Sequence, residues 1–328
     1  MRARVCRAGP RKAIALKFLA AVTMLAVGFV AHPVHADGIA PLTIEEIAPG
    51  VFVHAGKHEI WHPDNHGDIA NLSFVVGSSC VAVIDTGSTL AIGQRLLAAI
   101  RQVSDLPVCY VINTHAHPDH LLGNAAFANN ESEPHTAFVA HANMARAQAT
   151  RGQAYLQAVQ RDLKATAAGT RLVAPTLTVD TSVELDLGNK QLTVTAHPTA
   201  HTDADLTIYD PDSQTLWLGD LAFVGHLPVV DGNLNGWIDL MERLARLPAS
   251  IAIPGHGSWR HPGWPEMLAM QQDYLTRLRS SVRQAIANGD TLATTLATNK
   301  TGEQDGWHVY EQFHQRNVSA AFAELEWE

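Results

Sequence analysis

Four side chains that can bind a metal ion fall within six consecutive residues, in the run Thr114-His115-Ala116-His117-Pro118-Asp119-His120. The run follows residues 108–112, a short apolar segment that reads as a buried strand. On an irregular turn after a strand, His115 and His117 can converge on one ion while Asp119 and His120 face a neighbouring position. Chance rarely produces this density of donors, so the run predicts a metal centre at the end of a strand.

A run this short cannot enclose an ion by itself, so distant ligands are needed. Three further donors each follow an apolar segment and lie near a turn: His201, Asp220 and His256. His197, four residues before His201, is a competing candidate, and the residues alone leave the choice between them open.

The first 36 residues are typical of a secretory signal peptide. Basic residues precede an apolar run over 13–31, which only Lys17 interrupts, and Val34-His35-Ala36 offers small residues for cleavage before Asp37. The alternative is a membrane anchor, because the apolar run approaches spanning length. We expect cleavage after Ala36 and a periplasmic location.

Charge narrows the class of partner. Six of the 23 basic residues lie in the leader, so its removal leaves 17 against 32 acidic residues, a net charge of −15. Such a surface repels nucleic acid and anionic membranes. We therefore expect a small-molecule substrate, no nucleic acid, and no membrane span after cleavage.

Short apolar strands and helical segments alternate in two successive halves of the remaining chain. We expect strands over 51–54, 71–76, 81–84, 108–112, 137–140, 183–187, 190–196, 205–209, 215–218 and 251–253. We expect helices over 91–103, 121–128, 144–166 and 234–247, and from 264 to the end. This order predicts a two-sheet core covered by helices on both sides, with one domain over 37–263 and a helical segment over 264–328 packed on it.

The order of these motifs resembles the metallo-β-lactamase superfamily of metallohydrolases. The resemblance rests on Asp85-Thr86-Gly87, the His-x-His-x-Asp-His run, His201, Gly219-Asp220 and Pro254-Gly255-His256-Gly257. It extends from Val51 to about Gly257. It implies an α+β fold, a four-layer αββα sandwich with a C-terminal helical extension, and a dinuclear site at one edge.

Carried over residue by residue, the resemblance implies two zinc ions per chain. The first ion would be bound by His115, His117 and His201, and the second by Asp119, His120 and His256. Asp220 would bridge them. The family pattern of His-Thr followed by Asp favours His201 over His197. Asp85 would hold a ligand histidine in its tautomer, with a turn-capping carboxylate as the alternative.

The implied activity is that of a hydrolase in which a metal-bridging hydroxide attacks a carbonyl of the ester, thioester or lactam class, with Asp119 and Asp220 as the catalytic carboxylates. Dedicated zinc β-lactamases usually carry Cys or Ser at the position of Asp220. The chain is therefore more similar to glyoxalase-II-type hydrolases, and it most closely resembles the quinoprotein relay system zinc metallohydrolases. One alternative is an iron-dependent sulfur or oxygen redox enzyme on the same fold. Another is a non-catalytic accessory protein of a periplasmic quinoprotein dehydrogenase system.

Two segments are expected to shape the substrate pocket, although either could be an ordinary surface loop. Residues 58–68 contain His62 and His66, and residues 223–237 contain His226 and Trp237. No Lys or Arg is evident beside the distal ligands to hold a lactam carboxylate. With Asp220, this leads us to expect weak activity on β-lactams.

Cys80 and Cys109 are the two cysteines that follow the leader, since Cys6 lies within it. In the implied fold their strands are parallel neighbours that both lead to the metal edge. Neighbouring strands lie about 4.8 Å apart, within the range that a disulfide spans. We expect a disulfide in an oxidising compartment, with two buried thiols on opposite faces as the alternative.

Overall fold

The computed structural model describes residues 39–128 and 136–328, so the expected signal peptide lies outside the described residues. Seven strands form a mixed sheet in sequence order, antiparallel from β1 to β4 and parallel from β4 to β7. They are β1 (Glu45–Ala48), β2 (Val51–His54), β3 (Leu72–Val76), β4 (Val81–Ile84), β5 (Val108–Ile112), β6 (Ala137–His141) and β7 (Leu177–Val179).

A second sheet of five strands has the order β12-β11-β10-β9-β8. Its pairs are antiparallel except for β11 and β12, which run parallel. The strands are β8 (Ser182–Asp186), β9 (Gln191–Ala196), β10 (Leu206–Asp210), β11 (Thr215–Phe223) and β12 (Ile251–His256).

The two sheets face each other across a shared apolar core. Val53, Ile84 and Val139 of the first sheet belong to the same buried cluster as Val194 and Trp217 of the second. Because side chains alternate across a strand, this cluster uses one face of each sheet and leaves the other face for helices.

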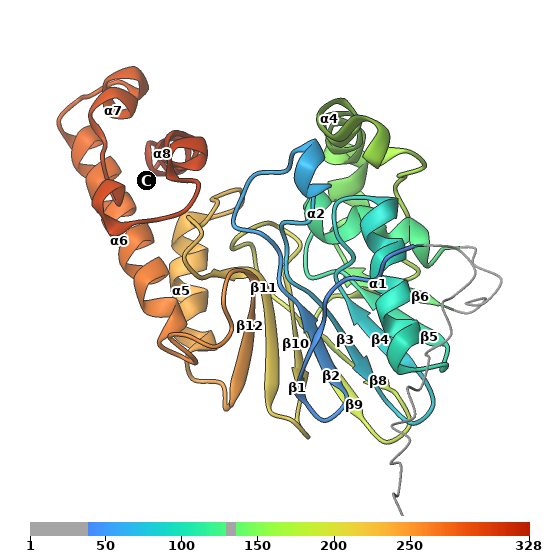
Figure 1. Cartoon of the computed structure of the whole chain (residues 1–328). Coiled ribbons are helices and arrows are strands. Elements are labelled where there is room, and N and C mark those ends of the chain that lie inside the picture. The colour runs from blue at the N-terminus through green and yellow to red at the C-terminus, as the bar shows by residue number, and fades with distance from the viewer. Residues whose placement is uncertain (1–38, 129–135) are drawn as a thin grey trace, which may run out of the picture. The chain divides into compact units, whose positions relative to one another are not determined.

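Helices cover both outer faces, as Figure 1 shows. They are α1 (Leu90–Val103), α2 (Pro118–Leu121), α3 (Met144–Ala147), α4 (Gln153–Leu163), α5 (Leu234–Leu244), α6 (Met267–Ala287), α7 (Leu292–Thr298) and α8 (Tyr310–Leu325). Helix α1 buries Ile92, Leu96 and Ile100, one stripe at helical spacing, against Phe74 and Val83 of the first sheet.

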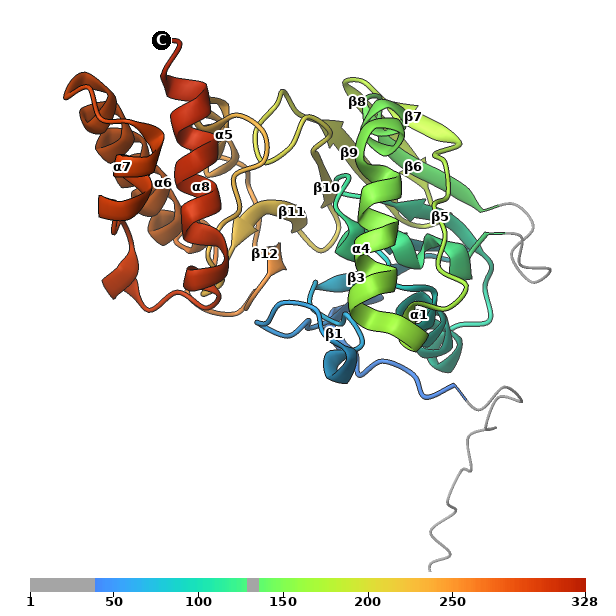
Figure 2. The same ribbon diagram turned by 90° about the horizontal axis from the view of Figure 1, so that it is seen from above.

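On the opposite side, α5, α6 and α8 pack over the outer face of the second sheet (Figure 2). Trp237 of α5, Tyr274 of α6 and Val318 of α8 share one buried cluster with Leu218 of β11. The prediction of a four-layer αββα sandwich with C-terminal helices is therefore confirmed.

Some local expectations differ from the structure. The edge strands β1 and β7, of four and three residues, were not expected. The expected helix over 121–128 is a short α2 followed by a 3-10 turn over Leu122–Ala126. None of the described helices is both long and apolar enough to cross a membrane.

The expected disulfide is present between Cys80 and Cys109, whose Cα atoms lie 5.7 Å apart. It joins the start of β4 to β5, which are parallel neighbours as expected. The chain leaves these strands at Asp85 and at the run that begins with Thr114, so the bond ties together the two strands that lead into the candidate site.

Candidate metal centre

All seven donors expected from the sequence lie together at one edge of the two sheets. His115 and His117 stand in the loop after β5, and Asp119 and His120 stand in α2. From the second sheet, His201 comes from the β9–β10 loop, Asp220 from β11 and His256 from the end of β12. All seven are buried, which removes their ring nitrogens and carboxylate oxygens from bulk water.

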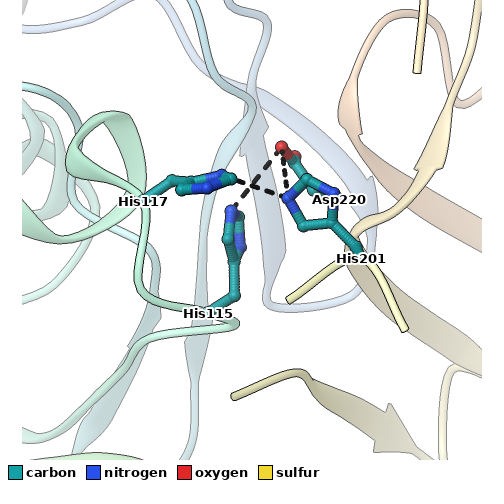
Figure 3. A group of neighbouring side chains, drawn as sticks. All are labelled: His115, His117, His201 and Asp220. Carbon is teal, nitrogen blue, oxygen red and sulfur yellow. Dashed lines mark hydrogen bonds and ion pairs between the residues drawn. The ribbon is translucent and has the colours of Figure 1, made fainter. Parts of the chain in front are cut away.

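Four of the donors form a first group, drawn in Figure 3. Nε2 of His201 lies 3.1 Å from Nδ1 of His117. Oδ2 of Asp220 lies 3.6 Å from Nε2 of His115 and 3.5 Å from Nε2 of His201. One ligand atom from each of the four residues lies within 4.8 Å of the others, which is the spacing of atoms around a common centre.

Asp119, His120 and His256 form a second group of the same kind. Nε2 of His256 lies 3.3 Å from Oδ2 of Asp119. The second oxygen of Asp220, Oδ1, lies 3.2 Å from Nε2 of His120 and 3.5 Å from Nε2 of His256. Asp220 thus directs one carboxylate oxygen toward each group.

Each of the five histidines has its other ring nitrogen occupied by a hydrogen bond at the back of the site. Nδ1–H of His201 donates to the Val229 carbonyl, and Nδ1–H of His256 donates to the Ile69 carbonyl, both at 2.8 Å. The remaining partners are Thr114 Oγ1 for His115 Nδ1, Asp85 Oδ2 for His120 Nδ1, and Asp231 Oδ2 for His117 Nε2. Such bonds fix the tautomer, so that each ring, when neutral, directs a lone pair inward.

Three of the inward atoms lack any hydrogen-bond partner although they are buried: Nε2 of His115, Nε2 of His120 and Oδ1 of Asp220. Buried polar atoms in folded proteins nearly always have a partner, because an unpaired one costs about 1–3 kcal/mol. A cation held between these atoms would supply the missing partner. The imidazole and carboxylate donors also suit zinc, so the residues present fit a pair of metal ions.

Comparisons with known proteins agree with this geometry. The sequence profile of the Metallo-beta-lactamase superfamily matches residues 66–256, a range that contains all seven donors. The chain belongs to the metallo-β-lactamase superfamily.

Two curated relatives illustrate the breadth of this superfamily. The chain is 23% identical to a linear primary-alkylsulfatase from Pseudomonas sp. over 53% of its own length and 39% of that protein. It is 27% identical to the acyl-coenzyme A thioesterase MBLAC2 from Bos taurus, over 58% of its own length and 74% of that protein. The chain therefore spans about two fifths of the alkylsulfatase.

Solved structures share the fold. A metallo-beta-lactamase from Pontibacter korlensis superposes with a TM-score of 0.57 at 23% identity, covering 72% of this chain and 99% of that chain. A stereoselective inverting sec-alkylsulfatase from Pseudomonas sp. gives a TM-score of 0.65 at 19% identity, covering 86% of this chain and 50% of that chain. These superfamily members and this chain have the same layered architecture.

Burial and the charges of neighbouring donors shift the pKa values of the donor side chains in opposite directions. Burial alone would lower the pKa of His256, but Asp220 and Asp119 outweigh it and raise that pKa to about 9. Burial lowers the pKa of His201 to about 3, and Asp220 only partly offsets this. Burial would raise the pKa of Asp119, yet His120 and His256 hold it at about 2. The carboxylates are thus ionised, and a cation would be attracted to them.

Gly255 makes room for the carboxylate between the two groups. A Cβ at this position would collide with Oδ1 of Asp220 and with the backbone of Gly219. The Pro-Gly-His-Gly motif therefore serves two purposes, since it presents His256 and lets β12 approach Asp220 closely.

Asp231 belongs to the site, although it was not expected there from the sequence. Its Oδ2 accepts from Nε2 of His117 at 2.9 Å and also from Arg151, and its Oδ1 pairs with Arg316 at 3.3 Å. Burial would raise the pKa of Asp231, but the hydrogen bond from His117 and the two guanidinium groups hold it far below its usual range. The carboxylate is placed to fix the orientation of His117.

A cavity of about 310 Å³ opens onto the donors. Asp119, Asp220, His117 and His256 lie on its wall, and so does His226. The ring of His226 stacks on that of His256 with centroids 4.7 Å apart, and burial lowers its pKa to about 3, so the ring is neutral. The expected segment over 58–68 also reaches the cavity, through Glu59, Ile60 and Trp61.

Three of the residues expected at the pocket lie elsewhere. His62 pairs with Glu59 at 3.0 Å and His66 is exposed, and neither lines the cavity. Trp237 is fully buried behind the site, where its ring lies 5.2 Å from that of His201. The competing candidate His197 also lies outside both donor groups, with its Nε2 2.8 Å from the hydroxyl of Thr207.

Residues that the sequence did not indicate complete the cavity wall. They are Tyr155 of α4 together with Phe313 and Arg316 of α8. Arg316 is a basic side chain on the cavity wall, linked to His117 through Asp231, that was not expected from the sequence. No local sequence signal could have placed it there, because an arginine on an amphipathic helix usually marks a solvated face.

Proposed function

We propose that this chain is an exported binuclear zinc hydrolase that cleaves a carbonyl compound of the ester, thioester or lactam class. The observation that carries the proposal is the position of Asp220, which directs one oxygen toward His115 and His201 and the other toward His120 and His256. A carboxylate in this position can bridge two ions, which a site for one ion does not require.

Zinc ions held by these seven donors would acidify a water molecule and polarise the bond that is cleaved. The protein's own groups orient the reaction. The carboxylate of Asp119 lies on the cavity wall and is ionised, so it can accept a hydrogen bond from the attacking water. The neutral ring of His226 and the side chains of Phe223 and Val229 form an apolar lining that limits the access of bulk water.

The activities of two relatives support a substrate with an acyl or alkyl chain. One relative is an acyl-coenzyme A thioesterase and another a linear primary-alkylsulfatase. The largely apolar cavity suits such a chain. We favour carbonyl substrates over sulfate esters because the chain covers 74% of the thioesterase but only 39% of the alkylsulfatase.

A periplasmic location is part of the proposal and rests on the leader and on the Cys80–Cys109 disulfide, which persists in oxidising compartments. A functional link to a quinoprotein dehydrogenase system rests on the sequence resemblance alone. Cell fractionation tests the location: a mature chain that begins near Asp37 in the periplasmic fraction supports it, and a full-length chain in the cytoplasm contradicts it.

The experiment that tests the activity combines metal analysis with turnover. Mature protein loaded with zinc is assayed against 4-nitrophenyl pentanoate, an acyl-coenzyme A and a cephalosporin. We expect hydrolysis that a chelator abolishes and that Asp220→Ala lowers at least about a hundredfold, as with loss of a group that stabilises the transition state. Asp212→Ala, at an exposed turn residue, is the matched control. One iron per chain with no hydrolysis would favour the redox alternative, and zinc without any turnover would favour the accessory-protein alternative.

A further inference from the structure

One wall of the cavity carries a single positive charge among apolar side chains. Within the described part of the chain, Arg316 is the only Lys or Arg that lines the cavity. Phe313 lies one helical turn before it on α8, so the two side chains project from the same face of the helix. Ile60 and Trp61 line the cavity from the β2–β3 loop.

The ion pairs around Arg316 leave one positive charge in excess. Arg316 belongs to a chain of five charged residues in which three guanidinium groups alternate with two carboxylates: Arg146, Asp203, Arg151, Asp231 and Arg316. Asp231 already accepts from Arg151 and His117 through its other oxygen. Arg316, at the end of this chain, is the member that lines the cavity.

The ion pair with Asp231 leaves hydrogen-bond donors of the Arg316 guanidinium free. The pair uses Nη2 of Arg316 at 3.3 Å, and Asp231 is the only described residue that forms an ion pair with it. A guanidinium has five N–H donors in a planar fork that matches a carboxylate. The side chain of Arg316 is half exposed, at 50%, so donors remain for a ligand in the cavity.

The helix that carries Arg316 is held firmly against the site. The next residue, Asn317, is fully buried. Its Oδ1 accepts from the Val230 amide at 2.9 Å, and its Nδ2 donates to the Pro228 carbonyl at 2.7 Å. Both partners lie in the loop that also carries Asp231. Arg316 is therefore held close to the candidate ligand His117, since both side chains contact the Asp231 carboxylate.

The other charges of the cavity do not cancel this role. Glu59 also lines the cavity, but its Oε2 accepts hydrogen bonds from His62 and from Asn65, each at 3.0 Å. Asp119 and Asp220 belong to the metal donors. An anionic group of a substrate in the cavity would therefore meet Arg316.

We infer that Arg316 recognises an anionic group of the substrate, and that the substrate combines the cleaved carbonyl bond with an apolar portion and, a short spacer away, a carboxylate or similar anion. The apolar portion would lie against Trp61 and Phe313. The inference rests on the proposed hydrolase function and names its substrate class. Arg316 acts in it as a specificity residue and takes no part in the chemical step.

The test compares two esters of equal acyl length, neutral 4-nitrophenyl pentanoate and anionic mono-4-nitrophenyl glutarate, with zinc-loaded mature protein. We expect kcat/KM to favour the glutarate ester. In Arg316→Gln this preference should fall about ten- to a hundredfold, the usual effect of losing a hydrogen bond to a charged group, so that kcat/KM falls more for the glutarate ester than for the pentanoate ester. Arg316→Lys should keep part of the preference. Arg283→Gln, at a surface arginine that pairs with Glu328, is the matched control.

A binding measurement separates this inference from the proposed function. Calorimetry with pentanamide and 5-amino-5-oxopentanoate, which differ only in the terminal carboxylate, should show tighter binding of the anion to the wild-type protein and equal binding of the two to Arg316→Gln, whether or not any ester is cleaved. If no ester is cleaved but binding still shows an Arg316-dependent preference for the anionic ligand, the proposed hydrolase function is overturned and the anion site is supported. Turnover without that preference, or equal losses for both esters in Arg316→Gln, would overturn the anion site alone.

Discussion

Oδ2 of Asp85 lies 2.8 Å from Nδ1 of His120, and the same carboxylate accepts hydrogen bonds from the backbone amide and the hydroxyl of Thr114. Thr114 Oγ1 in turn lies 3.0 Å from Nδ1 of His115. Asp85 has a left-handed backbone, with φ of 58°, a conformation that costs energy for a residue other than glycine. One carboxylate thus orients a candidate ligand from each of the two groups.

We expect Asp85→Asn to weaken zinc binding about 10–100-fold, because a carboxylate behind a ligand histidine fixes its tautomer and raises its basicity. Competition with a chromogenic chelator measures the affinity. Asp105→Asn, at an exposed residue, is the control. Unchanged zinc affinity would reduce Asp85 to a turn-capping residue.

Asp231→Asn should weaken zinc binding about 10–100-fold, because the Asp231 carboxylate accepts a hydrogen bond from Nε2–H of the candidate ligand His117 at 2.9 Å. The variant also removes the counter-charge of Arg151 and Arg316, so some loss of stability is expected. Thermal unfolding of the metal-free protein measures that structural loss separately. A lower Tm with full zinc affinity would show that Asp231 only balances the arginines. Asp239→Asn, exposed on α5, is the control.

His197 should act as an acid-sensitive structural residue. Burial, together with Arg243 and His141, lowers its pKa from 6.5 to about 4. The unfolded chain therefore binds more protons than the folded chain between these values, and this contribution to stability is present above pH 6.5 and lost as pH falls toward 4. The wild-type protein should lose free energy of unfolding between pH 7.5 and pH 5, and His197→Gln should reduce that loss by up to about 2 kcal/mol.

Urea unfolding at pH 7.5 and pH 5 measures this difference, and zinc content is measured in parallel. The variant should keep the zinc content of the wild-type protein. Loss of zinc in His197→Gln would instead place His197 among the ligands and displace His201.

The disulfide should stabilise the edge that presents the donors. Cys80 and Cys109 are separated by 29 positions, and closing a loop of this length is worth about 3–4 kcal/mol on the chain-entropy model. We expect the double variant Cys80→Ser/Cys109→Ser to unfold at a lower urea concentration, with its free energy of unfolding reduced by that amount. Titration of denatured, unreduced mature protein should find no free thiol, and two free thiols would contradict the bond.

The sequence sufficed to bring the seven donors to one edge because each lies near the carboxyl end of a strand or in the segment that follows one. His115 lies three residues after the end of β5, and Asp220 and His256 lie on the neighbouring strands β11 and β12, so the strand pattern alone brings them to one edge. The short edge strands β1 and β7 lacked the length that gives a clear alternation of apolar residues.

The cavity wall could not be predicted in this way, because it depends on packing between distant segments. Arg316 meets Asp231 across 85 positions of sequence. His62 pairs with Glu59, and it is Glu59 that lines the cavity, whereas Trp237 lies behind the site because α5 buries its apolar face. Neither orientation has a signal in the local sequence.

The central claim is that two metal ions share Asp220, and elemental analysis of zinc-loaded mature protein after extensive dialysis tests it most directly. We predict two zinc ions per wild-type chain and no more than about one in Asp220→Ala, with Asp212→Ala retaining two. A wild-type stoichiometry that never exceeds one, or an Asp220→Ala variant that still holds two, would contradict the account.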